Sequence, residues 1–120
     1  MRALMEFDVE IVLRESNRAV TERIAHGSEP GAWHEGDVET VLKQILLAID
    51  RVKNPTDRAR HVSLRGFSWI VEPLGDNVVI AIEIPMGAAV AGPFDIEQDR
   101  LDQMIRRVIA AAALPGATVH

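Results

Sequence analysis

The residues of this chain that could carry out chemistry are few and widely spread. Cysteine is absent, which excludes disulfides, thiol nucleophiles and every cysteine-containing metal site. The four histidines are His26, His34, His61 and His120. A zinc site needs three or four ligands brought together, and these separations match no compact ligand pattern. The one local group worth testing is His26, Glu29, His34 and Glu35. A polar loop has the same composition, so we expect neither a metal nor a cofactor.

Two further groups resemble parts of known catalytic or binding motifs. Glu10, Glu72 and Glu83 could gather on adjacent strands as a general acid and base, although solvated strands carry such residues without chemistry. The run 87–92, GAAVAG, has two glycines separated by four residues, as in a phosphate-binding loop. Pro93 and Phe94 then stand where a lysine and a hydroxyl residue are needed. This small run is therefore expected to be a loop that packs closely against the core or against another chain, and the chain is predicted to be noncatalytic rather than an enzyme.

Charge is distributed unevenly along the chain. The formal net charge is -5, yet the stretch 51–71 has five basic residues against one acid. Such a basic segment can bind an anion, because arginine pairs well with carboxylate and phosphate groups. It can equally be neutralised by the acidic remainder. The alternative function is therefore a binding protein or small enzyme for an anionic small molecule. Its ligand would lie against Arg58, Arg60, His61 and Arg65 near the run 87–92, with His61 as the proton carrier. The acidic net charge argues against nucleic acid as a partner.

The first half of the chain predicts two strands and a helix. Apolar residues alternate with charged ones from Glu6 to Arg14, which is the period of a strand buried on one face. The segment 19–25 can be a returning strand or a short helix, and the strand is favoured. A stripe of apolar residues then predicts a helix over 37–53, capped by Asp37 and stopped by Asn54 and Pro55. Leu47 projects away from that stripe and is expected to face solvent or a partner.

The second half predicts two strands and another helix. The segment 62–72 is interpreted as one long strand with a β-bulge at Gly66, which would bring its apolar residues onto one face. A nearly continuous apolar strand follows over 78–84. The residues 86–94 are interpreted as a loop, and a final helix capped by Asp95 is expected to end at Pro115.

These elements predict a two-layer α+β sandwich in the order ββαββα. A mainly antiparallel four-stranded sheet would carry both helices on one face. The length of 120 residues suits a single domain over 1–120, with a short disordered tail at 115–120. No apolar run is long enough to span a membrane and the first residues show no secretory signal, so a cytoplasmic protein is expected.

The uncovered face of this predicted sheet is too apolar for full exposure to water. Together with the outward position of Leu47, this predicts a protein that works through self-association as a homodimer or by binding a protein partner. The interface residues expected from facing alone are Leu47, Val12, Ile70 and Val79. Scattered surface hydrophobic residues are the simpler interpretation of the same pattern.

Overall fold

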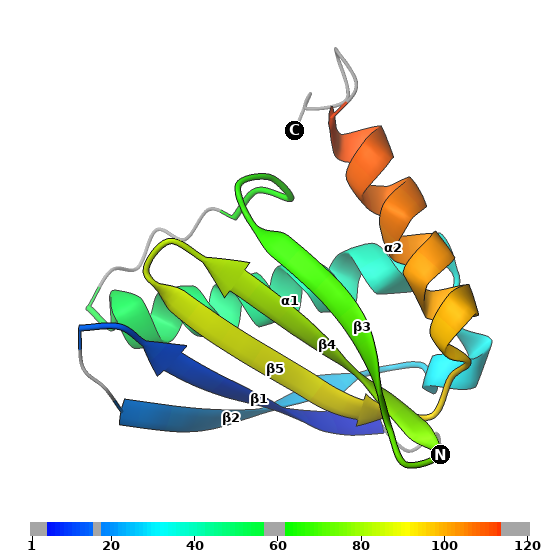
Figure 1. Cartoon of the computed structure of the whole chain (residues 1–120), viewed down its shortest axis with the longest axis horizontal. Coiled ribbons are helices and arrows are strands. Elements are labelled where there is room, and N and C mark those ends of the chain that lie inside the picture. The colour runs from blue at the N-terminus through cyan, green and yellow to red at the C-terminus, as the bar shows by residue number, and fades with distance from the viewer. Residues whose placement is uncertain (1–4, 16–17, 57–61, 114–120) are drawn as a thin grey trace.

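The computed structural model describes residues 5–15, 18–56 and 62–113, which fold into one five-stranded antiparallel sheet and two long helices (Figure 1). The strands are β1 (Met5–Leu13), β2 (Arg18–His26), β3 (Ser68–Leu74), β4 (Asn77–Ile84) and β5 (Gly87–Phe94). The helices are a short 3-10 turn, η1 (Pro30–Ala32), then α1 (Glu35–Lys53) and α2 (Gln98–Ala113). In space the strand order is β2-β1-β5-β4-β3, so β2 and β3 form the two edges.

One face of the sheet is covered and contains the core. Alternate residues of each strand are buried on it, including Phe7, Val9 and Ile11 of β1 and Ile80 and Ile82 of β4. Against them α1 lies behind the sheet and α2 lies beside β3 (Figure 1). Three aromatic rings pack together in this layer, and the ring centroid of Phe94 lies 5.0 Å from that of Phe7 and 5.1 Å from that of Trp33. The predicted two-layer α+β fold is confirmed.

Most of the predicted elements are confirmed with small shifts at their ends. The segment 19–25 is a strand, and β1, β4 and α1 lie where periodicity places them. The cap of α1 differs from the prediction, because the N-cap is His34 and Asp37 stands three residues further on. The Asp37 carboxylate accepts a hydrogen bond from the backbone N–H of His34, so it satisfies the helix end from inside the first turn. The second helix begins at Gln98, three residues after the predicted cap Asp95.

The prediction of a loop at 86–94 is wrong, because residues 87–94 form β5 in the middle of the sheet. Glycine, alanine and proline have low strand propensity, which hid the strand in the sequence. The strand forms because β1 and β4 pair with it on both sides and satisfy its backbone groups. The sheet therefore has five strands instead of four. A side chain at Gly87 would collide with the backbone of Val12 and Leu13, so the small residues allow close packing inside the sheet.

The prediction of a long bulged strand over 62–72 is also wrong. Gly66 has a φ of +78° and lies in a bend before β3, which starts only at Ser68. The residues before it cross the helix layer as an irregular segment, and Leu64 is buried in the core from there. Among the described strands, the register shifts between β4 and β5, at Val78 and Ile80. The expected tail at 115–120 lies outside the described residues.

Candidate binding surface

The second face of the sheet carries no helix. Its side chains come from the other residues of each strand, and the register lines them up in rows across the sheet. One row joins Glu10 of β1, Val90 of β5, Ala81 of β4 and Ile70 of β3. The next row joins Val12, Ala88, Glu83 and Ser68. They lie on the side of the sheet away from α1, and this side of the ribbon faces the viewer in Figure 1. We call this side the open face.

An apolar patch occupies the centre of the open face. Ile70, Val90 and Val12 keep 55%, 43% and 40% of their surface exposed, which makes them three of the five large apolar residues that the described chain leaves exposed. Half-buried Val79 lies beside Gly92, close to where a side chain on that glycine would be. A group of apolar side chains on adjacent strands, with no layer over it, differs from hydrophobic residues scattered singly on a surface. The open-face patch consists of Val12, Ile70, Val79, Ala81, Ala88 and Val90.

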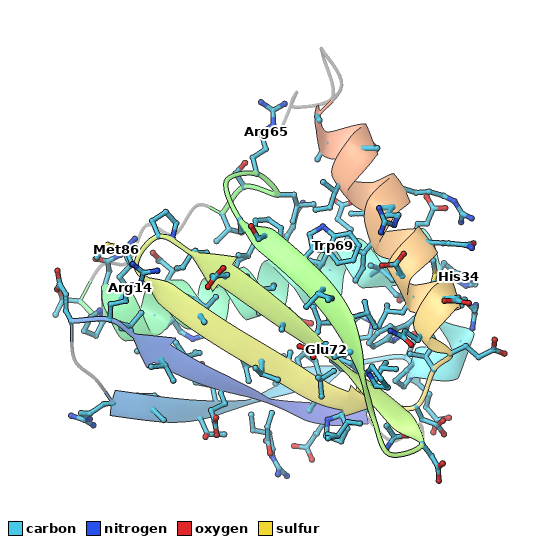
Figure 2. All side chains as sticks on the ribbon, viewed as in Figure 1. Arg14, His34, Arg65, Trp69, Glu72 and Met86 are labelled. Carbon is cyan, nitrogen blue, oxygen red and sulfur yellow. The ribbon has the colours of Figure 1, made fainter. Side chains whose placement is uncertain are left out.

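The borders of the patch are acidic. Five carboxylate residues share the open face, Glu6, Asp8, Glu10, Glu72 and Glu83, and Figure 2 labels Glu72 on β3. Arg23 of β2 is the one basic side chain within the strands on this face, and its Nε donates to Asp8 Oδ1 at 3.1 Å. Arg14 lies just past the end of β1. The open face is therefore apolar in the middle and negatively charged around it.

The four predicted interface residues separate into two places. Val12, Ile70 and Val79 come together on the open-face patch, as the alternation of their strands indicated. Leu47 does not join them, because it lies on α1 in the helix layer and is half-buried. Sequence reasoning offered the run 87–92 as a contact surface but took it for a loop, so it did not place Val90 and Ala88 on this face of the sheet. The residue types of this run do not alternate between polar and apolar, so they carried no signal of a strand with one buried face.

The predicted anion site can be followed only at Arg65, because Arg58, Arg60 and His61 lie outside the described residues. Arg65 is exposed in the bend before β3, and its guanidinium donates to the backbone oxygen of Ala112 at 2.9 Å. Figure 2 shows Arg65 well away from Met86 at the start of the run 87–92. The predicted site required a loop at 87–92 beside the arginines. This run is instead a strand of the sheet, and Arg65 does not lie next to it.

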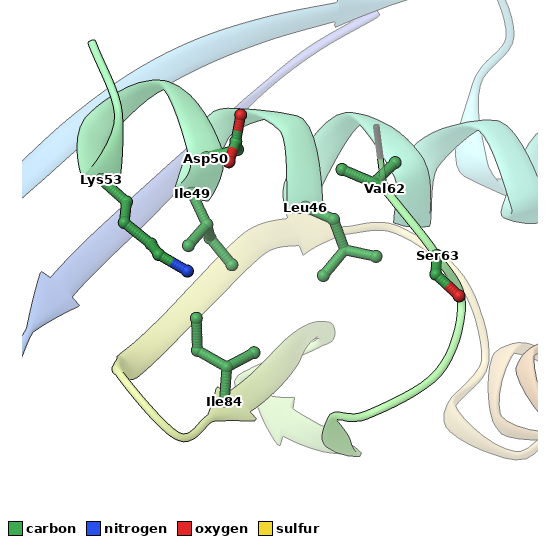
Figure 3. Close-up of a pocket in the computed structure, with 7 residues that line it drawn as sticks. All are labelled: Leu46, Ile49, Asp50, Lys53, Val62, Ser63 and Ile84. Atoms are coloured by element: carbon green, nitrogen blue, oxygen red, sulfur yellow. The ribbon is translucent and has the colours of Figure 1, made fainter. Parts of the chain in front are cut away.

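The hollows of the helix layer are shallow. A groove between α1, α2 and the segment 62–65 has a volume of about 480 Å³ and includes Arg65. Its charged lining residues Glu35, Glu39, Lys43 and Arg65 balance one another, and Lys43 is bonded to Glu39 at 2.8 Å. A neighbouring hollow of about 120 Å³ lies between the end of α1 and Ile84 (Figure 3). Its lining is mainly aliphatic, with Lys53 at one side. Lys53 is the one basic residue among those that line it, so no second cation is present to bind an anion together with it.

The closest pair of groups with catalytic character is His26 and Asp37. His26 Nε2 lies 3.1 Å from Asp37 Oδ1, and the histidine ring also meets the edge of Trp33. The second carboxylate oxygen accepts the His34 N–H, and this bond lowers the pKa of Asp37. Asp37 thus stays ionised and joins the end of β2 to the start of α1. The pair serves the helix cap, and no third reactive side chain is bonded to it in the described part of the chain.

The carboxylates and the histidine group singled out in the sequence are not brought together in the described residues. Glu10 has Thr21 and Val90 as its cross-strand neighbours, and Glu83 has Ser68 and Ala88. Neither carboxylate faces another across a strand pair, as an acid and base pair would. Within residues 5–15, 18–56 and 62–113 no group of three potential ligand side chains is close enough to hold a metal ion. Neither described helix has the length and apolar character needed to cross a membrane.

Comparison of the chain with protein family models, with curated proteins and with solved structures gives no match. The open face therefore has to be interpreted from its own geometry.

Proposed function

We propose that this protein is a noncatalytic binding protein, and that the open face of its sheet binds a basic amphipathic helix of a partner protein. The observation that supports this most strongly is the open-face patch, with Val12 of β1, Val90 of β5 and Ile70 of β3 exposed on the same face of the sheet. Every other apolar layer of the described chain is covered. A helix on this face would give the sheet a second covered side, which is the ordinary solution for an apolar sheet surface.

The size of the patch suits one helix. Its residues span four neighbouring strands, from β1 to β3, and strands lie about 4.8 Å apart, so the patch is roughly 14 Å wide. A helix with its side chains is about 10–12 Å in diameter. One amphipathic helix lying along the strands would therefore cover the patch, and its flanks would lie above the carboxylates of Glu10 and Glu83.

The charge of the open face selects the partner. Carboxylates outnumber guanidinium groups on this face, so two copies meeting face to face would bring like charges together. A helix with lysine or arginine beside its apolar stripe would instead place cations over Glu10, Glu72 and Glu83. This charge pattern favours a basic partner over a second copy at this surface.

A titration with a model peptide tests the proposal. The probe is a fluorescein-labelled amphipathic helix of leucine and lysine, and its control is the same peptide with glutamate in place of lysine. We expect added protein to raise the fluorescence anisotropy of the lysine peptide but not that of the glutamate peptide. The affinity of the lysine peptide for the protein should fall as salt increases. The double variant Ile70→Ser, Val90→Ser should lose this binding. Met86→Ser, at an exposed apolar residue in the turn after β4, should retain it. Equal binding of both peptides, or unchanged binding by the double variant, would contradict the proposal.

A further inference from the structure

The two edge strands of the sheet differ in how accessible their outward backbone N–H and C=O groups are to another strand. On β3 the side-chain amide of Gln98 donates to the outward backbone oxygen of Val71 at 2.9 Å. Pro73 shares this outward direction, two residues on, and has no N–H to leave unpaired. A proline and a side-chain bond are both ways in which proteins block the addition of another strand. The β3 edge is therefore closed.

The backbone directions in β2 follow from the strands beside it. The N–H of Arg14 donates to the oxygen of Met86, which continues the β1–β5 ladder with the even-numbered residues of β1 pointing at β5. The odd-numbered residues of β1 therefore bond to β2, where their partners are even-numbered, as in the pair Ile11 and Val20. It follows that the odd-numbered residues of β2 point their N–H and C=O groups away from the sheet.

Side-chain contacts agree with this direction and limit the open stretch. Gln44 of α1 donates to the backbone oxygen of Ala25 at 3.1 Å, so this oxygen does point outward and is already satisfied. Ala19, Thr21 and Arg23 have the same direction, and no hydrogen bond from the described residues reaches their outward groups. These three positions form an unblocked edge in the middle of a strand that contains neither proline nor glycine.

The side chains along this stretch leave room for another strand. Ala19 and Thr21 are small and lie on the open side of the sheet. Arg23, which could repel an incoming strand, is bonded to Asp8 on the inner neighbour β1. A charged side chain held in this way guards the edge less than a free one does.

We propose that this edge pairs with β2 of a second copy of the chain, in an antiparallel ladder with its two-fold axis at Thr21. In this register Thr21 pairs with Thr21 of the second copy, and Ala19 pairs with Arg23. All three unblocked positions of each strand are then used, with about six backbone hydrogen bonds across the axis. A register centred elsewhere would leave one of these positions unpaired or would require the oxygen that Gln44 already occupies.

The side chains of both layers are compatible with this pairing. Arg18 falls diagonally across from Glu22 of the second copy, and long opposite charges at that spacing attract. Leu47 lies three residues after Gln44 and four before Arg51, and both of those side chains bond to β2. Helix geometry therefore places Leu47 on the flank of α1 beside the open edge, where a second helix layer would adjoin it.

The resulting dimer would have a continuous ten-stranded sheet. A two-fold axis perpendicular to the sheet leaves both open faces on the same side, so the two open-face patches would lie on one surface. A partner with two basic helices could then engage both patches at once, which raises its apparent affinity.

The mass of the protein in solution tests this pairing. Size exclusion with light scattering at micromolar concentration should give twice the chain mass for the natural protein and for Thr21→Ala, which keeps the N–H. Thr21→Pro removes one outward donor at an edge position that proline tolerates, and it should give the mass of one chain with an unchanged far-UV spectrum. A natural protein with the mass of one chain, or a folded Thr21→Pro variant that remains dimeric, would overturn the proposal.

Cross-linking provides a second measurement that does not depend on the proline. The chain has no cysteine, so single-cysteine variants are unambiguous. Mild oxidation should convert Thr21→Cys to a disulfide-linked dimer, because hydrogen-bonded pairs lie about 5.5 Å apart. Ala25→Cys lies on the same edge and side, but its two copies would be about 27 Å apart, so it should stay uncross-linked. Equal cross-linking of both variants, or cross-linking of Ala25→Cys alone, would contradict the register.

The double variant Ile70→Ser, Val90→Ser should remain dimeric, and its dissociation would assign the dimer contact to the open face instead.

Discussion

The two faces of this sheet are built from the same strands, but the helices bury one face and leave the other exposed. On β4 and β3 the isoleucines Ile82 and Ile70 lie on opposite sides, with 1% and 55% of their surface exposed. The covered face is apolar along β1, β5, β4 and β3, whereas the open face combines a small apolar centre with carboxylates. The first composition serves the stability of the chain itself. The second costs little in water and becomes useful when a complementary surface arrives, which is why we assign binding to the open face.

The sharpest test of this comparison removes the same atoms from each face. Ile82→Ala should lower the free energy of unfolding by about 2–5 kcal/mol, because it leaves a cavity in the core. Ile70→Ala should change it by less than about 0.5 kcal/mol, as surface substitutions usually do. Chemical denaturation of the two variants measures both values. Similar losses for the two would show that the open face is already covered by the chain itself.

A substitution within β5, the strand that the sequence did not predict, tests whether its close packing against β1 stabilises the sheet. Gly87→Ala places a methyl group against the backbone of Val12, so β1 and β5 must move apart. We expect a loss of roughly 1–3 kcal/mol in the free energy of unfolding. Gly36→Ala is the matched control, because no atom lies within 4 Å of the added methyl on α1 and alanine favours a helix. It should leave the thermal unfolding temperature unchanged or raise it, and a reversed order of the two variants would refute this role for Gly87.

The smallest expected effect concerns the covered layer alone and depends on pH. The His34 N–H lowers the pKa of Asp37, so the ionised carboxylate stabilises the fold above the ordinary aspartate pKa of about 3.9. This stabilisation is lost as the pH falls through the lower pKa of the folded state. Asp37→Asn should therefore cost about 1 kcal/mol at pH 7, and its difference from the natural protein should shrink below about pH 4. A difference that is independent of pH would mean that the charge of Asp37 does not support the cap.

Periodicity predicted the parts of the fold in which side chains alone decide the structure. The alternation in β1 and the apolar stripe of α1 are clear, so both elements and the facing of Val12, Ile70 and Val79 could be predicted. The small residues of 87–94 carry no such signal, because their strand exists through pairing with neighbours that are distant in the chain. The sheet order could not be predicted without it. The edge at Thr21 depends on that order as well, so neither it nor the place of Val90 could be inferred.

The central claim is that the open face binds a basic amphipathic helix, and a methyl NMR titration tests it most directly. Protein labelled at isoleucine and valine methyl groups would be titrated with the leucine and lysine peptide. The account predicts saturable shifts at Val12, Ile70, Val79 and Val90, while the buried methyl groups of Val9 and Ile82 remain largely unchanged. Shifts confined to residues of the groove between α1 and α2, such as Val108, or no shifts at all, would contradict it.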